Sequence, residues 1–200
     1  MNGITYYRRN GQIQSITYHN CDESFPLHTH NDHLMLGVVK DGNVVIGING
    51  NEAEYMAGMQ FIIMPNVAHT LRPGNEKHYT MTVICVKTNV IVSNEHLSEL
   101  WRKIIDEPEN VKQINEMAEQ LQVSPYHFIR QFKQVFGLTP HAFQIQSRVR
   151  KAQRIIEAGA DNQDAVYLAG FYDESHMDRC FQKYVKMTPG QYRESIRQNR

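Results

Sequence analysis

Arg130 and Arg179 occupy equivalent places in a segment that the chain contains twice. Residues 132–143 are echoed by residues 181–192, and a Thr-Pro pair stands at the same position in both copies. An internal repeat at a fixed offset indicates one structural unit built twice. An arginine at a fixed place in each unit can donate two hydrogen bonds to guanine O6 and N7, if that place faces a DNA groove.

The first copy lies in a predicted pair of helices. Residues 114–121 have a short amphipathic pattern, and a tight turn separates them from Ser124-Pro125, a typical N-cap followed by a typical first helical residue. Three phenylalanines of the following segment, 125–136, recur at i, i+4 and i+8 and share one face: Phe128, Phe132 and Phe136. Two helices joined in this way are typical of a helix-turn-helix motif.

The remaining face of the second helix carries polar side chains. Besides Arg130, Gln131 can pair with adenine, and Lys133 is a point charge for phosphate. In the second copy Asp173 is the predicted N-cap, whereas Glu174 and Asp178 oppose phosphate. The predicted DNA-binding residues are Tyr126, His127, Arg130, Gln131, Lys133, Ser175, His176, Arg179 and Gln182. The alternative for each is an ordinary solvated or capping side chain.

The stretch from about Leu100 to Arg197 resembles the DNA-binding domain of the AraC/XylS family of bacterial transcription regulators. The matching residues are Met117-Ala118, Ser124-Pro125, Arg130–Lys133, Gly137–Pro140, Gly170-Phe171, Arg179, Phe181, Thr188-Pro189 and Tyr192-Arg193. The resemblance implies an all-α domain that binds double-stranded DNA, contacts RNA polymerase and acts as an activator.

A long helix is predicted to join the two units over Thr139–Ala158, with a Gly159 stop. Its 20 residues span roughly 30 Å, close to the roughly 34 Å between successive major-groove faces of DNA. One chain can therefore place its two helix-turn-helix units in adjacent major grooves.

The first ninety residues predict short strands and tight turns. Asp41-Gly42 and Asn49-Gly50 stand between apolar runs and are typical of two-residue hairpins. Further strands are predicted around Phe61–Met64 and Thr80–Val86. Short strands at this spacing favour a small antiparallel barrel or sandwich.

This half is similar to a cupin, the jelly-roll sensor that AraC-type regulators often carry. The likeness rests on His28-Thr29-His30, Asn49-Gly50, Gly58 and Pro65–His69. In metal-binding cupins an H-x-H pair, a Glu and a later His hold one ion, which implies His28, His30 and His69 as ligands here. The Glu position falls near Leu34, and His33 is the predicted substitute, since neutral imidazole suits several divalent metals. The alternative is a pocket for a small polar effector.

Composition limits the class of protein further. Net charge is zero, but residues 110–200 hold 13 Lys/Arg against 9 Asp/Glu, while residues 1–109 hold 8 against 12. A basic half beside an acidic half favours a DNA-binding module tied to another domain. The three cysteines lack a disulfide framework, which predicts free thiols, and no apolar run is long enough for a membrane span. We expect a soluble, cytoplasmic protein.

These observations predict an α+β chain with two domains. Residues 1–92 are expected to form a small antiparallel β-barrel or jelly roll, and residues 93–200 two helix-turn-helix units, with a first helix over Glu95–Asp106. The function that fits best is a sequence-specific transcription regulator that is not an enzyme, with a ligand or divalent metal in the cupin-like half. The alternatives are a metal-dependent cupin enzyme and a protein-interaction regulator without its own operator.

Overall fold

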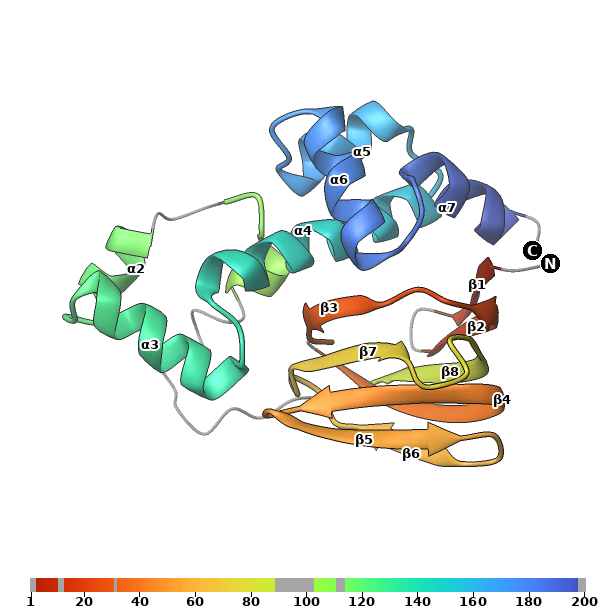
Figure 1. Ribbon diagram of the computed structural model, residues 1–200. Coiled ribbons are helices and arrows are strands. Elements are labelled where there is room, and N and C mark those ends of the chain that lie inside the picture. The colour runs from red at the N-terminus through yellow and green to blue at the C-terminus, as the bar shows by residue number, and fades with distance from the viewer. Residues whose placement is uncertain (1–2, 11–12, 31, 89–102, 111–113, 198–200) are drawn as a thin grey trace. The chain divides into compact units, whose positions relative to one another are not determined.

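The computed structural model describes residues 3–10, 13–30, 32–88, 103–110 and 114–197 (Figure 1). The chain divides into two compact units, one made of residues 1–89 with 191–200 and the other of residues 90–190. The first unit contains the strands, and the second contains most of the helices. The α+β class and the order of the two halves are as predicted.

The described part of the first unit contains eight antiparallel strands. They are β1 (Gly3–Asn10), β2 (Ile13–Cys21), β3 (Phe25–His28), β4 (His33–Ile48), β5 (Asn51–Met56), β6 (Gln60–Ile63), β7 (His69–Pro73) and β8 (Tyr79–Lys87). The order across the sheet is β1-β2-β8-β4-β7-β3, with β5 and β6 also paired to β4. Alternate side chains point inward and form the core, where Val39, Tyr79 and Met81 are fully buried.

Strand β4 runs without interruption through Asp41-Gly42, so the predicted hairpin at this place is wrong. The first part of β4 pairs with β8 and β6, and its second part pairs with β5 and β7. The change of partner needs a bulge, which lies between Val39 and Asp41. Gly42 has φ of 69°, and a Cβ there would lie 2.3 Å from the carbonyl oxygen of His78. Gly42 is therefore required by the backbone conformation inside β4 and does not form a hairpin turn.

The second hairpin signal is confirmed. Asn49 and Gly50 form the two-residue turn between β4 and β5, with φ of 53° and 82°. Two consecutive positive φ values are typical of a type I′ turn, whose twist matches that of the flanking strands. The Ile48 and Asn51 pair closes the ladder beside the turn.

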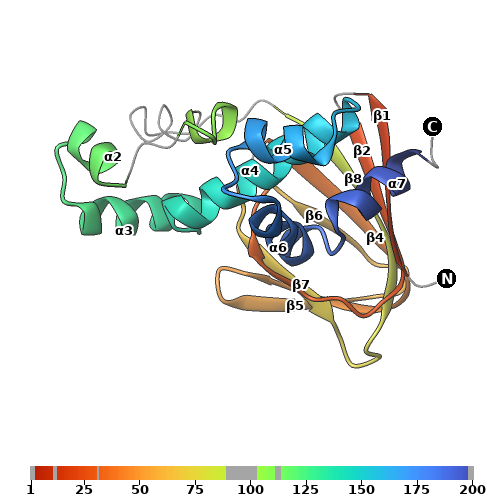
Figure 2. The same ribbon diagram turned by 90° about the horizontal axis from the view of Figure 1, so that it is seen from above.

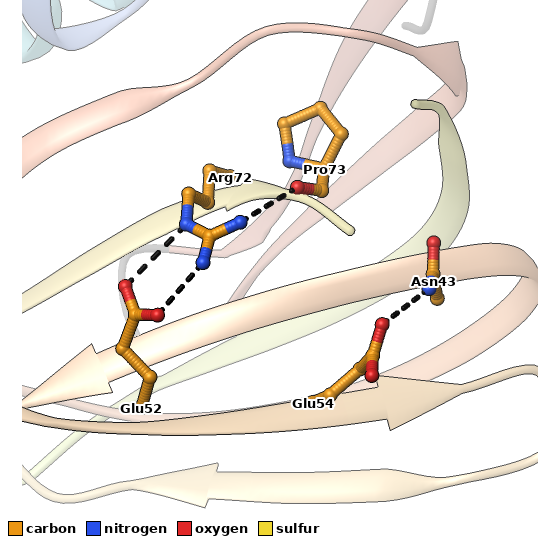
Figure 3. Close-up of polar contacts among 5 residues, drawn as sticks. All are labelled: Asn43, Glu52, Glu54, Arg72 and Pro73. Carbon is orange, nitrogen blue, oxygen red and sulfur yellow. Dashed lines mark hydrogen bonds and ion pairs between the residues drawn. The ribbon is translucent and has the colours of Figure 1, made fainter. Parts of the chain in front are cut away.

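Polar side-chain contacts connect β5 to β4 and to β7 (Figure 3). The buried Asn43 donates from Nδ2 to Glu54 and accepts through Oδ1 from the backbone N–H of Glu76 at 3.1 Å. The exposed Arg72 forms a bidentate pair with Glu52, with Nη2 to Oε2 at 2.7 Å and Nε to Oε1 at 3.4 Å. Asn43 therefore fixes the turn before β8, whereas Arg72 and Glu52 make a solvated cross-strand pair.

The described helices of the second half are short, apart from α4. They are α2 (Ile114–Gln120), α3 (Pro125–Phe136), α4 (Pro140–Glu157), α5 (Asn162–Ala169), α6 (Glu174–Tyr184) and α7 (Pro189–Arg197). In both views α2 and α3 lie at one end of α4, while α5 and α6 lie at the other (Figures 1 and 2). This is the predicted arrangement of two helix-turn-helix units on one long helix.

The predicted helix ends agree with the structure. Ser124, Thr139 and Asp173 are N-caps whose side-chain oxygens accept from the backbone N–H three residues on. The predicted joining helix, Thr139–Ala158, is α4 with its two caps. Of the predicted helix over Glu95–Asp106, only residues 103–106 belong to the described part, and they are helical. None of the helices in that part is long and apolar enough to cross a lipid bilayer.

Candidate nucleic-acid interface and histidine cluster

Helix α3 is held by its aromatic face. Phe128, Phe132 and Phe136 are almost completely buried, as predicted, and their rings form a chain with centroid separations of 5.8 and 4.5 Å. Phe143 of α4 joins them at 5.6 Å from Phe132. Aromatic packing of this kind fixes the rotation of α3 about its axis. The polar face is therefore held in a defined direction.

That polar face is open to solvent. Tyr126, Arg130 and Lys133 are exposed, and the Tyr126 side chain keeps 76% of its surface. His127 and Gln131 flank them and are half-buried. The structure thus brings the five predicted residues of the first unit onto the accessible side of one capped helix. An exposed helix of this kind can enter a major groove.

Helix α6 repeats this arrangement. Met177 and Phe181 are fully buried and correspond to Phe128 and Phe132, while Ser175, Arg179 and Gln182 are exposed. Tyr184 is only half-buried, and Val185 completes the core instead, at the place of Phe136 in the first unit. His176 is half-buried, as His127 is, and its ring packs edge-on against Phe171 with the ring centroids 5.4 Å apart.

Carboxylates distinguish the second helix from the first. Asp178 lies one turn after Glu174 on α6. Burial of its carboxyl, together with repulsion from Glu174, raises the pKa of Asp178 above its ordinary value. A negative charge at this place opposes phosphate, as expected from the sequence.

The structure brings together three of the four predicted histidines. The ligand nitrogens of His28, His30 and His69 all lie within 4.8 Å of one another. His28 and His69 are directly opposite each other in the β3–β7 pair, with ring centroids 4.2 Å apart. His30 follows β3, and its ring stacks on that of His69 at 5.4 Å. Strand pairing therefore brings His69 next to His28 and His30, which precede it by 41 and 39 positions in the chain.

Backbone hydrogen bonds orient two of these rings. His28 Nδ1 lies 2.8 Å from the carbonyl oxygen of Pro26, and His69 Nδ1 lies 2.9 Å from that of Val67. A carbonyl oxygen only accepts, so Nδ1 carries the proton and the ring's lone pair resides on Nε2. Metal-binding histidines typically donate their other ring N–H to a carbonyl or carboxylate oxygen in this way. Tetrahedral ligands about 2.05 Å from a zinc ion lie roughly 3.3 Å apart, so a small contraction of the cluster would suit such an ion.

His33 lies outside the cluster. It begins β4 opposite Lys87 of β8, and its Nδ1 is 2.7 Å from the carboxylate of Asp32. The other three histidines come from the β3–β7 pair. Among the described residues, the set that can hold a metal is therefore His28, His30 and His69, and not the four that the sequence suggested.

Comparisons with known proteins agree with this architecture. A model described as "Helix-turn-helix domain" matches residues 117–195, and one described as "Cupin domain" matches residues 17–87. The regulator MtrA of Neisseria gonorrhoeae is 34% identical over 101 residues, which cover 50% of this chain and 34% of MtrA. The chain therefore combines a helix-turn-helix domain with a cupin domain.

Two further relatives show how far this likeness extends. The bifunctional transcriptional activator and DNA repair enzyme Ada of Escherichia coli is 32% identical over 87 residues, or 44% of this chain and 25% of Ada. The crystal structure of ToxT from Vibrio cholerae has the same fold, with a TM-score of 0.65 at 9% identity, covering 94% of this chain and 99% of ToxT. The match spans only 34% of the length of MtrA and 25% of the length of Ada.

Sequence reasoning did not single out the exposed tyrosines of the second unit. Tyr167 and Tyr172 keep 82% and 91% of their side-chain surface. A sequence signal was present, because the turn from Gly170 to the N-cap Asp173 is one residue longer than the turn from Gln122 to the N-cap Ser124. Tyr172 is the additional residue of the second turn.

Proposed function

We propose that the protein is a sequence-specific transcription regulator that binds double-stranded DNA through α3 and α6, and that it is not an enzyme. One observation carries this proposal. Two capped helices, anchored by equivalent buried residues, expose Arg130 and Arg179 at the same place in each unit. Arginine in this position can read guanine, and a shared joining helix can set the spacing of two adjacent major grooves.

Activation through contact with RNA polymerase is part of the proposal. It rests on the resemblance of the helical half to the AraC/XylS family, which implies contact with RNA polymerase. The relatives MtrA and Ada are named as transcription regulators, and the name of Ada includes activation.

The first experiment is to isolate the operator. The full chain is mixed with sheared genomic DNA at about 0.15 M salt, near physiological ionic strength, and the retained fragments are sequenced. A common motif with two elements about one helical turn apart supports reading by both helices. Retention of all fragments in proportion to their length, or of none, would contradict the proposal.

The histidine cluster supports a sensor role for the cupin half. We propose that His28, His30 and His69 hold a divalent metal, or else form the polar end of a site for a small effector. The Nδ1 atoms of His28 and His69 donate to backbone carbonyls and leave Nε2 for an ion, and His30 adds a third imidazole. A solvent molecule would complete a four-coordinate site. The Glu position of metal-binding cupins falls near Leu34, which cannot ligate.

A further inference from the structure

The helical unit contains a pocket that the proposed DNA reading does not use. It has a volume of about 730 Å³ and lies between α4, α5, α6 and the residues just before α2. This volume falls within the range of about 300–1,000 Å³ typical of small-molecule sites. Its walls come from Ile155, Leu168 and Phe171, with Tyr167, Tyr172 and His176 around them.

The two helix-turn-helix units differ at this place. Gln122 and Gly170 both have positive φ at the end of a helix, so they are equivalent positions. Three residues before them stand Glu119 and Tyr167, and two residues before them stand Gln120 and Leu168. All four of these side chains are exposed. The first unit folds with the polar pair Glu119-Gln120 at these positions. The apolar pair Tyr167-Leu168 of the second unit is therefore not needed for folding. Exposed apolar side chains gathered around a hollow mark a binding site.

The pocket also carries a net positive charge. Lys151 forms an ion pair with Glu109, and Arg148 adds a second cation on the same side of α4. The Nε of Arg148 donates to the carbonyl oxygen of Pro108 at 3.0 Å, which fixes the guanidinium at the wall. Burial lowers the pKa of Arg148, because its charge is partly desolvated. Two cations and one carboxylate leave an excess of one positive charge facing an apolar cavity.

We propose that this pocket binds a small organic anion with a flat apolar body. The aromatic rings of Tyr167, Tyr172 and Phe171 provide faces and edges on which a planar ligand can pack. The guanidinium of Arg148 is the partner for its carboxylate, sulfonate or phosphate group, since arginine favours bidentate pairing with such anions. This site lies in the helical unit and is distinct from the histidine cluster of the first unit.

The test uses two dyes that share one ring system. The anion 8-anilinonaphthalene-1-sulfonate and its uncharged analogue N-phenyl-1-naphthylamine are titrated into the full chain, and binding is followed by fluorescence and calorimetry. We expect saturable binding of the anion at one site. The neutral analogue should bind at least about tenfold more weakly, because it lacks the charge-assisted hydrogen bond. Equal affinity for the two dyes would overturn the assignment of Arg148.

The chain itself provides the decisive variant. Tyr167→Glu with Leu168→Gln gives the second unit the residues of the first, at exposed positions where folding should be unaffected. The affinity for the anion should fall about tenfold or more, since both apolar walls are lost and a like charge is added. The matched control is Val135→Glu, which adds the same charge at an exposed apolar residue of α3 outside the pocket and should bind the dye as the wild type does. Unchanged binding and stoichiometry in the double variant would overturn the proposal.

A variant of the cation completes the experiment. Arg148→Met keeps most of the side-chain volume and removes the charge, so it should weaken binding of the sulfonate but leave the neutral analogue unchanged. Because Arg148 also holds Pro108, circular dichroism of the variant is recorded first. If that variant does not fold, Lys151→Gln and the pair of dyes still decide whether the site prefers an anion.

Discussion

Gln122 and Gly170 end equivalent helices of the two units in the same left-handed backbone conformation, with φ of 54° and 77°. Glycine adopts this conformation without steric cost, whereas glutamine does not. Gln122→Gly relieves this strain but increases the conformational entropy of the unfolded chain. The net effect should be a gain of about 0.5–1 kcal/mol in the free energy of unfolding. Urea unfolding of the full chain, followed by the helical signal in circular dichroism, measures the change.

The reverse substitution has a second cost. A Cβ at Gly170 would lie 2.5 Å from Cα of Glu109, a contact with backbone that cannot simply rotate away. Gly170→Ala should thus destabilise by more than Gln122→Gly stabilises. A gain in stability for Gly170→Ala would show that the two helix ends are not equivalent.

Asn43 and Arg72 provide a contrast between a buried and an exposed polar contact (Figure 3). Asn43→Ala removes the partner of the Glu54 carboxylate and of the Glu76 N–H, so the free energy of unfolding should fall by about 1–3 kcal/mol. Arg72→Ala breaks only a solvated pair with Glu52 and should shift the urea midpoint little, and less at high salt. Similar losses for both variants would contradict this ranking.

The features that could be predicted from the sequence are local. Ser124, Thr139 and Asp173 act as N-caps because each needs only its own helix, and the phenylalanines of α3 reveal their buried face by spacing alone. The β4 bulge between Val39 and Asp41 could not be predicted, because it depends on which strands pair with each half of β4. His33 is close to His28 and His30 in sequence, but it pairs with β8 and therefore lies apart from them. The sequence does not reveal this pairing.

Zinc binding tests the histidine cluster. Addition of Zn²⁺ to chelator-treated protein should raise the melting temperature in a concentration-dependent way, because the ion binds only the folded state. His30→Ala and His69→Ala should abolish the shift, while His33→Ala, which lies outside the cluster, should keep it. The effect should weaken as the pH falls, because protons compete with the metal for the imidazole nitrogens. A zinc-dependent shift that survives both substitutions in the cluster would exclude this site.

Asp178 should make stability depend on pH. Burial and the neighbouring Glu174 raise the pKa of Asp178 in the folded protein, so the folded state holds this proton more tightly than the unfolded state. The resulting penalty is absent well below the ordinary carboxyl pKa, grows as pH rises through the raised pKa, and is complete at neutral pH. Asp178→Asn should therefore raise the urea midpoint at pH 7 but hardly at pH 3.5.

An exposed carboxylate of the first unit provides the control for this effect. Glu119→Gln changes the charge of the protein by the same amount, at an exposed position on α2. It should not show the same dependence on pH. If the two variants respond alike, the effect reports net charge and not the environment of Asp178.

The two reading helices can be separated with one arginine from each. Arg130→Ala should cost about 1–3 kcal/mol of binding free energy on the selected operator, with a relaxed preference at one base pair and little change on scrambled DNA. Arg179→Ala should act at a base pair about one helical turn away and cost less, because Glu174 and Asp178 oppose close approach to phosphate. Arg154→Ala, an exposed arginine of α4 outside both helices, is the control.

Titrations at two salt concentrations distinguish base from phosphate contacts, since the latter release counterions. Equal losses on both DNAs would mean that Arg130 touches only the backbone. Unaltered binding by Arg179→Ala would mean that α6 acts as a structural brace and that one chain reads a single groove.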